Sequence, residues 1–276
     1  MNNSPKHEII IEPKRGFIPL RWSEIWQYRE LLRFLTVRDI KVRYKQTVLG
    51  GLWAILQPFM NMVVFTVFFG MLAKIPSDNL PYPIFVYAAL LPWQFFSNAI
   101  NNAANSLVAS SHLISKVYFP RIIIPSASLG AGFLDFIIAF SILIIMMFYY
   151  GIFPGTGIFL LPFLVLIIAF AALGVGMILA ALNVAYRDFR YVIPFLVQFW
   201  LFATPVIYPA TIVPERWRWL INLNPMSGLI TSFRSSLLNT PFLWSDLYIS
   251  SAVSVALFFI GIFYFTRMER RFADII

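Results

Sequence analysis

Six apolar stretches, each about long enough to cross a lipid bilayer as a helix, constrain this chain more than any other feature of its sequence. They lie at 52–71, 84–107 (softened by amide side chains), 124–150, 158–183, 191–208 and 247–266. A helix needs about 20 predominantly apolar residues to span the hydrocarbon core. Hydrophobic residues make up 60% of the chain and charged residues 12%, whereas soluble domains average about 45–50% and about 25%. The sequence therefore predicts an all-α integral membrane protein with six transmembrane helices.

The basic residues between these stretches predict the orientation of the helices. With six spans, both termini lie on one side of the membrane, and that side carries 17 of the 21 Lys and Arg residues. Loops rich in Lys and Arg stay in the cytoplasm, so we expect both ends inside. The net charge of +9 has the same explanation, and no nucleic-acid partner is expected.

Two regions follow from this pattern. Residues 1–50 are expected to form a cytoplasmic tail and an amphipathic helix at the membrane interface, and residues 51–276 the membrane domain. On the helix predicted over 22–42, Arg29 and Arg33 fall opposite an apolar face. That face consists of Ile25, Tyr28, Leu31, Leu32 and Leu35. The pattern is typical of a helix lying in the interface, and it leaves open whether the helix also docks a partner.

The last external loop, residues 209–246, is long and still apolar. Its prolines divide it into two short amphipathic helices, expected at about 215–223 and 226–238. Backbone groups at membrane depth must be satisfied internally, so we expect these helices to be re-entrant or interfacial. The tryptophans Trp217, Trp219 and Trp244 are suited to the membrane surface.

Several chemistries are excluded by what the sequence lacks. It has no cysteine, and its two histidines, His7 and His112, lie far apart, so no metal site is expected. The glycine cluster at 151–157 lacks the lysine of a phosphate-binding loop. A membrane-embedded glycosyl- or phosphotransferase would need clustered acids or histidines, which are absent. We therefore expect no enzyme and no cofactor in this chain, and any ATP must bind another subunit.

Asp135 is the one carboxylate clearly inside a predicted span. Such a residue is costly in hydrocarbon and is a functional candidate by default. One interpretation is structural, with Asp135 bonded to a neighbouring helix or to arginine side chains of a loop. The other is a proton-coupled carrier, which would usually carry more than one such acid.

Two stripes at helical spacing mix amide groups with bulky apolar side chains. The first consists of Trp53, Gln57, Met60, Asn61, Val64 and Phe68, and the second of Tyr191, Phe195, Gln198, Phe199 and Phe202. Such stripes favour a wet cavity over lipid, and aromatic faces can stack on sugar rings, although helix–helix packing remains an alternative. Close helix packing is the role expected of Gly130, Ala131, Gly132, Gly174, Gly176 and Ala180.

The segment RDIKVRYKQTVLGGLWAILQP at 38–58 closely resembles the start of the permease subunit of bacterial polysaccharide ABC exporters. These are the O-antigen, teichoic acid and capsule systems of the ABC-2 class. Further similar motifs are KVYFPR at 116–121 with Pro125, LNVAYRD at 182–188, Gln198 with TPVIY at 204–208, and LNPM at 223–226. The family often has Ser-Pro where Thr204-Pro205 stands. The resemblance covers essentially the whole chain.

The resemblance implies a homodimer in the bacterial inner membrane that binds two copies of a cytoplasmic ABC ATPase, which would hold ATP and Mg. The cargo would be a polysaccharide linked to a polyprenyl diphosphate. The first and fifth spans, with Tyr208, would line its path. Contacts to the lipid diphosphate would fall to Arg38, Lys41, Arg43 and Lys45, for which plain anchoring at the cytoplasmic surface is the alternative.

The same resemblance implies roles at both ends of the spans. Coupling to the ATPase would involve Trp26, Arg29, Arg33, His112, Lys116, Arg121, Tyr186, Arg187 and Asp188. An external gate would involve Trp217, Trp219, Asn224 and Pro225. The alternatives are another cargo on the same fold (teichoic acid, capsule, a drug or a lipid) and a proton-coupled carrier dependent on Asp135.

Overall fold

The computed structural model describes residues 22–45, 50–186 and 188–275, and every regular element in these ranges is a helix. The expected tail at 1–20 lies outside them. The α-helices are α1 (Trp22–Gln27), α2 (Arg29–Lys45), α3 (Leu52–Phe65), α4 (Tyr82–Ala109), α5 (Ser111–Lys116), α6 (Ile123–Tyr150), α7 (Leu161–Ala185), α8 (Phe189–Phe202), α9 (Glu215–Asn222), α10 (Pro225–Leu238) and α11 (Trp244–Ile275). A π-helix, η1 (Thr66–Leu72), continues α3, and short 3-10 helices lie at η2 (Thr156–Leu160) and η3 (Ala210–Ile212).

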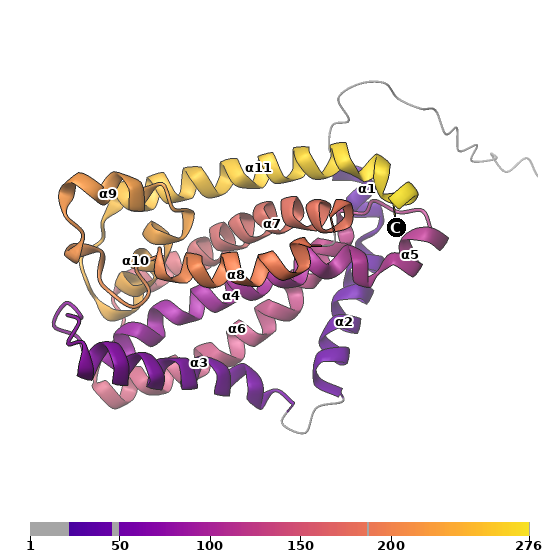
Figure 1. Cartoon of the computed structure of the whole chain (residues 1–276). Coiled ribbons are helices and arrows are strands. Elements are labelled where there is room, and N and C mark those ends of the chain that lie inside the picture. Colours follow the sequence, from indigo (N-terminus) through magenta and orange to yellow (C-terminus); the bar gives the residue numbers. More distant parts are fainter. Residues whose placement is uncertain (1–21, 46–49, 187, 276) are drawn as a thin grey trace, which may run out of the picture.

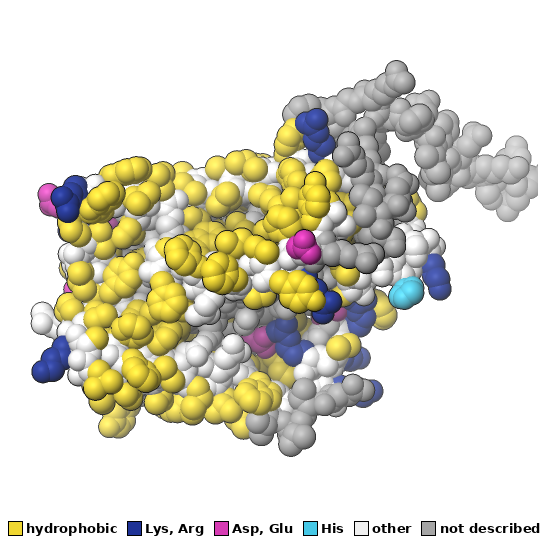
Figure 2. Space-filling model, in the orientation of Figure 1, with side chains coloured by type: hydrophobic (Ala, Val, Ile, Leu, Met, Phe, Trp, Pro, Cys, Tyr) yellow, Lys and Arg dark blue, Asp and Glu magenta, His cyan; other side chains and the backbone are white. Residues whose placement is uncertain are grey.

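The long helices α3, α4, α6, α7, α8 and α11 run between two ends of an elongated bundle (Figure 1). Helices α1 and α5 and the last turns of α11 lie at one end, and α9 and α10 lie at the other. Figure 2 shows hydrophobic side chains over most of the side of this bundle and charged side chains mainly towards its ends. This distribution matches a protein whose sides face lipid.

Four helical segments in the described ranges are long and apolar enough to cross a membrane: Leu52–Leu72, Ile123–Tyr150, Thr156–Ala185 and Trp244–Glu269. They correspond to the first, third, fourth and sixth predicted stretches. The second stretch forms the 28-residue helix α4, whose amides lower its hydropathy. The fifth forms α8.

The predicted length of the fifth stretch, 191–208, is wrong. Helix α8 ends at Phe202, and residues 203–209 are irregular. Pro205 explains this end, since proline has no N–H to continue a helix and disfavours helical geometry in the residue before it. Its 14 residues reach only about 21 Å at 1.5 Å per residue, less than the ~30 Å core of a bilayer.

Helix α4 is the centre of the bundle, where it contacts α6, α7, α10, α3 and α8. Its first turns, from Ile84 to Leu91, are buried on all sides. The tightest helix pair is α7 with α11, because Gly174 lies against the backbone of α11. A Cβ atom added to Gly174 would lie 2.5 Å from the carbonyl oxygen of Leu257. The predicted packing role of this glycine is therefore confirmed.

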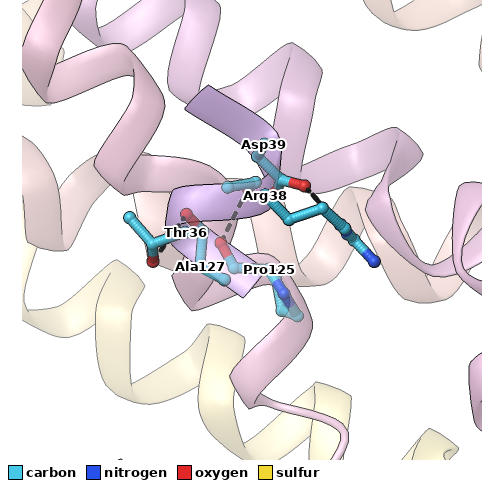
Figure 3. Close-up of polar contacts among 6 residues, drawn as sticks. Thr36, Arg38, Asp39, Pro125 and Ala127 are labelled. Carbon is cyan, nitrogen blue, oxygen red and sulfur yellow. Dashed lines mark hydrogen bonds and ion pairs between the residues drawn. The ribbon is translucent and has the colours of Figure 1, made fainter. Parts of the chain in front are cut away.

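The N-terminal helices bury the face that the sequence predicts. Leu35 is buried, and Ile25, Tyr28, Leu31 and Leu32 are partly buried against the same cluster. Helix α2 runs three residues beyond the expected end, to Lys45, and packs against α6. The Thr36 hydroxyl donates to the Ala127 carbonyl of α6 at 3.4 Å (Figure 3). Helix α2 is thus attached to a long helix of the bundle.

The two short helices of the last loop form close to their predicted bounds but differ in burial. Every residue of α9 from Glu215 to Leu220 is exposed. In α10, all residues except Thr231 are buried, so this helix lies inside the bundle. Its neighbours α4, α7, α11 and η2 surround it and enclose its polar side chains as well as its apolar ones.

Candidate functional site

A polar pocket of about 290 Å³ lies between α2, α3, α4 and α6. We define it by its charged and amide lining residues together with Tyr44 and Trp53: Arg43, Tyr44, Trp53, Gln57, Gln94, Asn98, Asn102 and Asp135. The rest of its wall is apolar or backbone, including Leu91, Phe95 and Phe136. A concentration of amide and charged groups inside a predominantly apolar bundle is costly unless they are paired or functional.

Asp135 occupies one side of this pocket and joins α6 to α2. Its Oδ2 atom forms an ion pair with Nη1 of Arg43, and its Oδ1 atom accepts a hydrogen bond from the Tyr44 hydroxyl. Burial and the bond to Asp135 raise the pKa of Tyr44 well above its ordinary value, so its hydroxyl remains a donor at neutral pH. This geometry supports the structural interpretation of Asp135, with its partners on the segment that precedes the first span.

The other basic residues predicted to contact a lipid diphosphate differ in whether their side chains already have a partner within the chain. Arg38 is bonded to its neighbour Asp39, with Nη2 and Oδ1 2.8 Å apart (Figure 3). The side chains of Lys41 and Lys45 are exposed. The structure therefore brings Arg43 into the pocket and leaves the two lysines on the surface of α2, and the lipid contact stays a prediction.

Three amides of α4 lie on the pocket side of that helix. Gln94, Asn98 and Asn102 follow one another at intervals of four residues, which places them on one helix face. The Nε2 atom of Gln94 and the Nδ2 atom of Asn102 are buried and have no hydrogen-bond acceptor among the described residues. Sequence reasoning recorded these amides only as softening a span. Their four-residue spacing is the signal that would have identified them.

The neighbouring amides of α4 are used differently. The side-chain nitrogens of Asn101 and Asn105 donate to the carbonyls of Ser97 and Asn101, at 2.9 and 2.8 Å. Asn183 of α7 donates to the Ala104 carbonyl at 2.9 Å. These bonds hold side chains to their own helix or join α4 to α7. Asn101 and Asn105 therefore bond along α4, whereas Gln94, Asn98 and Asn102 line the pocket.

The two predicted path stripes lie on the surface of the chain. Trp53 and Gln57 line the pocket. The remaining large apolar members on α3 and η1 and all aromatic members on α8 are exposed: Met60, Val64, Phe68, Tyr191, Phe195, Phe199 and Phe202. Gln198 is exposed as well, whereas Asn61 and Tyr208 are partly buried. Within the described part of the chain, packing does not account for these stripes.

Helices α3 and α8 flank a recess in the molecule. Both contact α4, which lies behind them in Figure 1. Figure 2 shows the surface between the positions of α3 and α8 as hollowed and largely free of hydrophobic side chains. The exposed stripes therefore border a more polar surface.

Asn224 joins the end of α8 to α10. Its Oδ1 atom accepts from the Met226 amide at 3.0 Å, capping α10, and from Nε1 of Trp200 at 3.0 Å. Its Nδ2 atom donates to the Thr204 hydroxyl at 2.8 Å. Pro225, the first residue of α10, is buried. Of the predicted gate residues, Asn224 and Pro225 are thus built into the fold, whereas Trp217 and Trp219 are exposed on α9.

Arg234 is a buried cation of α10 that sequence reasoning counted only as a loop charge. Its guanidinium donates to the carbonyls of Phe85, Pro205 and Val206, each at 3.2 Å. It also lies 3.6 Å from the centre of the Phe85 ring. Burial lowers its pKa to about 9, so it remains charged at neutral pH. A lone arginine in a short helix of small and apolar residues was the available signal.

Most of the residues predicted to couple to an ATPase are exposed at the end of the bundle that carries α1 and α5. Trp26, Arg29, Arg33, His112, Lys116, Tyr186 and Asp188 are exposed there, whereas Arg187 lies outside the described residues. Arg121 is engaged internally, since its backbone N–H donates to Oε1 of Glu269 at 2.9 Å and its guanidinium to the Glu269 carbonyl. A groove of about 490 Å³ between α5 and α11 includes Lys116, Tyr118 and Arg121.

An apolar helical bundle with a polar pocket between its helices has the organisation of a membrane transport protein. The family model of the ABC-2 type transporter matches residues 30–238, and the chain belongs to this family.

Curated relatives extend the similarity beyond the matched segment. The chain is 27% identical to the O-antigen export system permease protein RfbA of Klebsiella pneumoniae, over 90% of this chain and 95% of that protein. It is 35% identical to the protein of the same name from Myxococcus xanthus, over 77% and 82%. It is 25% identical to the polysialic acid transport protein KpsM of Escherichia coli, over 80% and 83%.

Proposed function

We propose that this chain is the transmembrane permease subunit of an ATP-driven exporter that moves a polysaccharide, linked to a polyprenyl diphosphate, across the bacterial inner membrane. The names of the similar proteins support the cargo class, since they concern export of O-antigen and transport of polysialic acid. The observation that carries the proposal is the polar pocket, lined by Trp53 and Gln57 of the first stripe, together with the exposed aromatic side chains of both stripes in an otherwise apolar bundle. A polysaccharide needs such a polar and aromatic surface to cross lipid.

The chain crosses the membrane six times, with both ends in the cytoplasm. The distribution of 17 of the 21 Lys and Arg residues supports this orientation. The antiparallel sequence of α3, α4, α6, α7, α8 and α11 in Figure 1 also fits it. Helix α8 is too short to cross alone, so the irregular residues 203–209 complete its passage. Their carbonyls are partly satisfied by Arg234.

Two copies of the chain enclose the path. The stripes on α3 and α8 are exposed in a single copy, and a hydrated glycan cannot pass along a surface that is open to lipid. A second copy facing α3 and α8 supplies the opposite wall. The exposed aromatic side chains then contact the polymer or the partner copy, as dimer interfaces rich in aromatics do.

A separate ATPase supplies the energy and docks at the end of the bundle that carries α1 and α5. The exposed residues of α1, α2 and α5 there include Arg29, Arg33 and Lys116, and the adjacent groove offers a concave surface. Because Asp135 ties α2 to α6, movement of α2 reaches the pocket wall directly. ATP and Mg bind the ATPase and not this chain.

The proposal is tested by affinity purification of the full chain from its native host in mild detergent, with ATP hydrolysis measured on the eluate. We expect a co-purifying ATPase in equal copy number and, in cells lacking the chain, polysaccharide retained inside. A chain that purifies alone without hydrolysis, together with normal surface polysaccharide in the deletion strain, would contradict it. Transport that survives ATP depletion but fails in Asp135→Asn would favour the proton-coupled carrier instead.

A further inference from the structure

The polar pocket contains donors that the described protein does not satisfy. Nε2 of Gln94 and Nδ2 of Asn102 are buried without an acceptor, although buried polar groups in native proteins are almost always hydrogen-bonded. Both amides line the same cavity, with Asn98 between them on the same helix face. The amide side chains that line the cavity supply donors and acceptors for a ligand, and the two buried nitrogens reach it once their amide groups rotate.

The charges of the pocket select an uncharged ligand. Arg43 and Asp135 form an ion pair with each other, so the cavity has no net charge from these two residues. A phosphate group would meet the Asp135 carboxylate, and the guanidinium beside it is already paired. A hydrocarbon chain would leave the amides unsatisfied. Hydroxyl groups both donate and accept, and so they match amides in every orientation.

The pocket also has an aromatic wall and a limited size. Trp53 lines it and keeps 54% of its surface exposed, so its indole is available to stack on the apolar C–H face of a sugar ring. The volume of about 290 Å³ lies just below the usual range of about 300–1,000 Å³ for small-molecule sites. There is room for one or two rings and not for a longer oligosaccharide.

We propose that this pocket binds one uncharged sugar residue of a glycan, hydrogen-bonded by Gln94, Asn98 and Asn102 and stacked on Trp53. The inference rests on the proposed function and deepens it, because it locates a sugar-binding step at the junction of α2, α3, α4 and α6. Since Arg43 and Asp135 border the same cavity, the position of α2 controls the width of the binding site.

Binding is tested on the full chain in lipid nanodiscs, free of sugar-based detergent, by saturation-transfer NMR. The probes are the methyl glycosides of glucose, galactose, mannose and N-acetylglucosamine, with glycerol 3-phosphate as the anionic comparison. We expect transfer to at least one methyl glycoside and none to glycerol 3-phosphate. Gln94→Leu and Asn102→Leu should each weaken binding about threefold to tenfold, the range expected for one hydrogen bond.

The matched control is Asn101→Leu, one residue from Asn102 on the same helix but outside the pocket, and it should bind as the unchanged chain does. If the leucine variants fail to accumulate in the membrane, Gln94→Ala and Asn102→Ala replace them, because alanine favours helix and adds no bulk. The proposal is overturned if no methyl glycoside binds or if glycerol 3-phosphate binds instead. It is also overturned if the double variant, which carries both Gln94→Leu and Asn102→Leu, binds the glycoside as tightly as the unchanged chain does.

Export in the native host separates this inference from the proposed function. In cells lacking the chain, the variants with weakened binding should restore surface polysaccharide poorly, while Asn101→Leu restores it fully. If the deletion strain lacks surface polysaccharide and the double variant restores it fully, the sugar site is refuted but the proposed exporter function is not. Normal surface polysaccharide in the deletion strain would refute the exporter itself.

Discussion

The ion pair between Arg43 and Asp135 should contribute measurably to the stability of the chain. The exposure of its two side chains allows this free-energy contribution to be estimated. The two side chains are 32% and 17% exposed. Removing one partner of a fully buried pair costs about 3–5 kcal/mol, whereas a fully exposed pair contributes about 0–1 kcal/mol. Tyr44 would still donate to Asp135 after loss of the arginine. We therefore expect Arg43→Met to destabilise the chain by about 2 kcal/mol.

The assay is thermal unfolding of the purified chain in nanodiscs, combined in a double-mutant cycle with Asp135→Asn. Because each single change removes the same ion pair, the double variant should be less destabilised than the sum of the two, with a coupling energy of about 1–2 kcal/mol. Lys41→Met is the control, since Lys41 is exposed on the same helix. Additive effects, or an Arg43→Met variant as stable as Lys41→Met, would refute the reasoning.

Four further predictions address other parts of the chain. Gly174→Leu should prevent accumulation of folded protein, measured by size-exclusion chromatography, because it forces α7 off α11, while Ala256→Leu on the exposed face of α11 should not. Arg234→Met leaves three carbonyls without their donor and should lower stability to thermal unfolding by about 3 kcal/mol. Asn224→Ala removes the cap of α10 and should cost about 1–2 kcal/mol in the same measurement. Phe195→Ala, at a side chain that is 70% exposed, should leave unfolding unchanged but reduce export to the cell surface.

Helix positions were predictable from the sequence because hydropathy is a property of each segment on its own. The third stretch, 124–150, became α6 at Ile123–Tyr150, and the buried face of α2 was found by helical spacing alone. The end of α8 was missed because the residues after Phe202 are as apolar as those before it. The signal lay in Thr204-Pro205, where backbone geometry overrides hydropathy.

The candidate site was only partly predictable, because it depends on contacts between distant segments. Asp135 was identified as costly and in need of a partner, but nothing in its own helix names Arg43 and Tyr44, which lie more than 90 positions away. The burial of α10 was missed for the same reason. Its serines and Arg234 look polar in sequence, and only the surrounding helices show that each is enclosed.

The close glycine contact between α7 and α11 makes this side of the bundle differ from the side formed by α3 and α8. Because the two backbones touch at this point without side chains between them, the helices cannot slide or separate there without losing the contact. Helices α3 and α8 have no such restraint, and their outer faces carry large side chains free of the bundle. We therefore expect the α7–α11 pair to stay together when the bundle widens, and the movement to occur at α3 and α8, on the opposite side of α4.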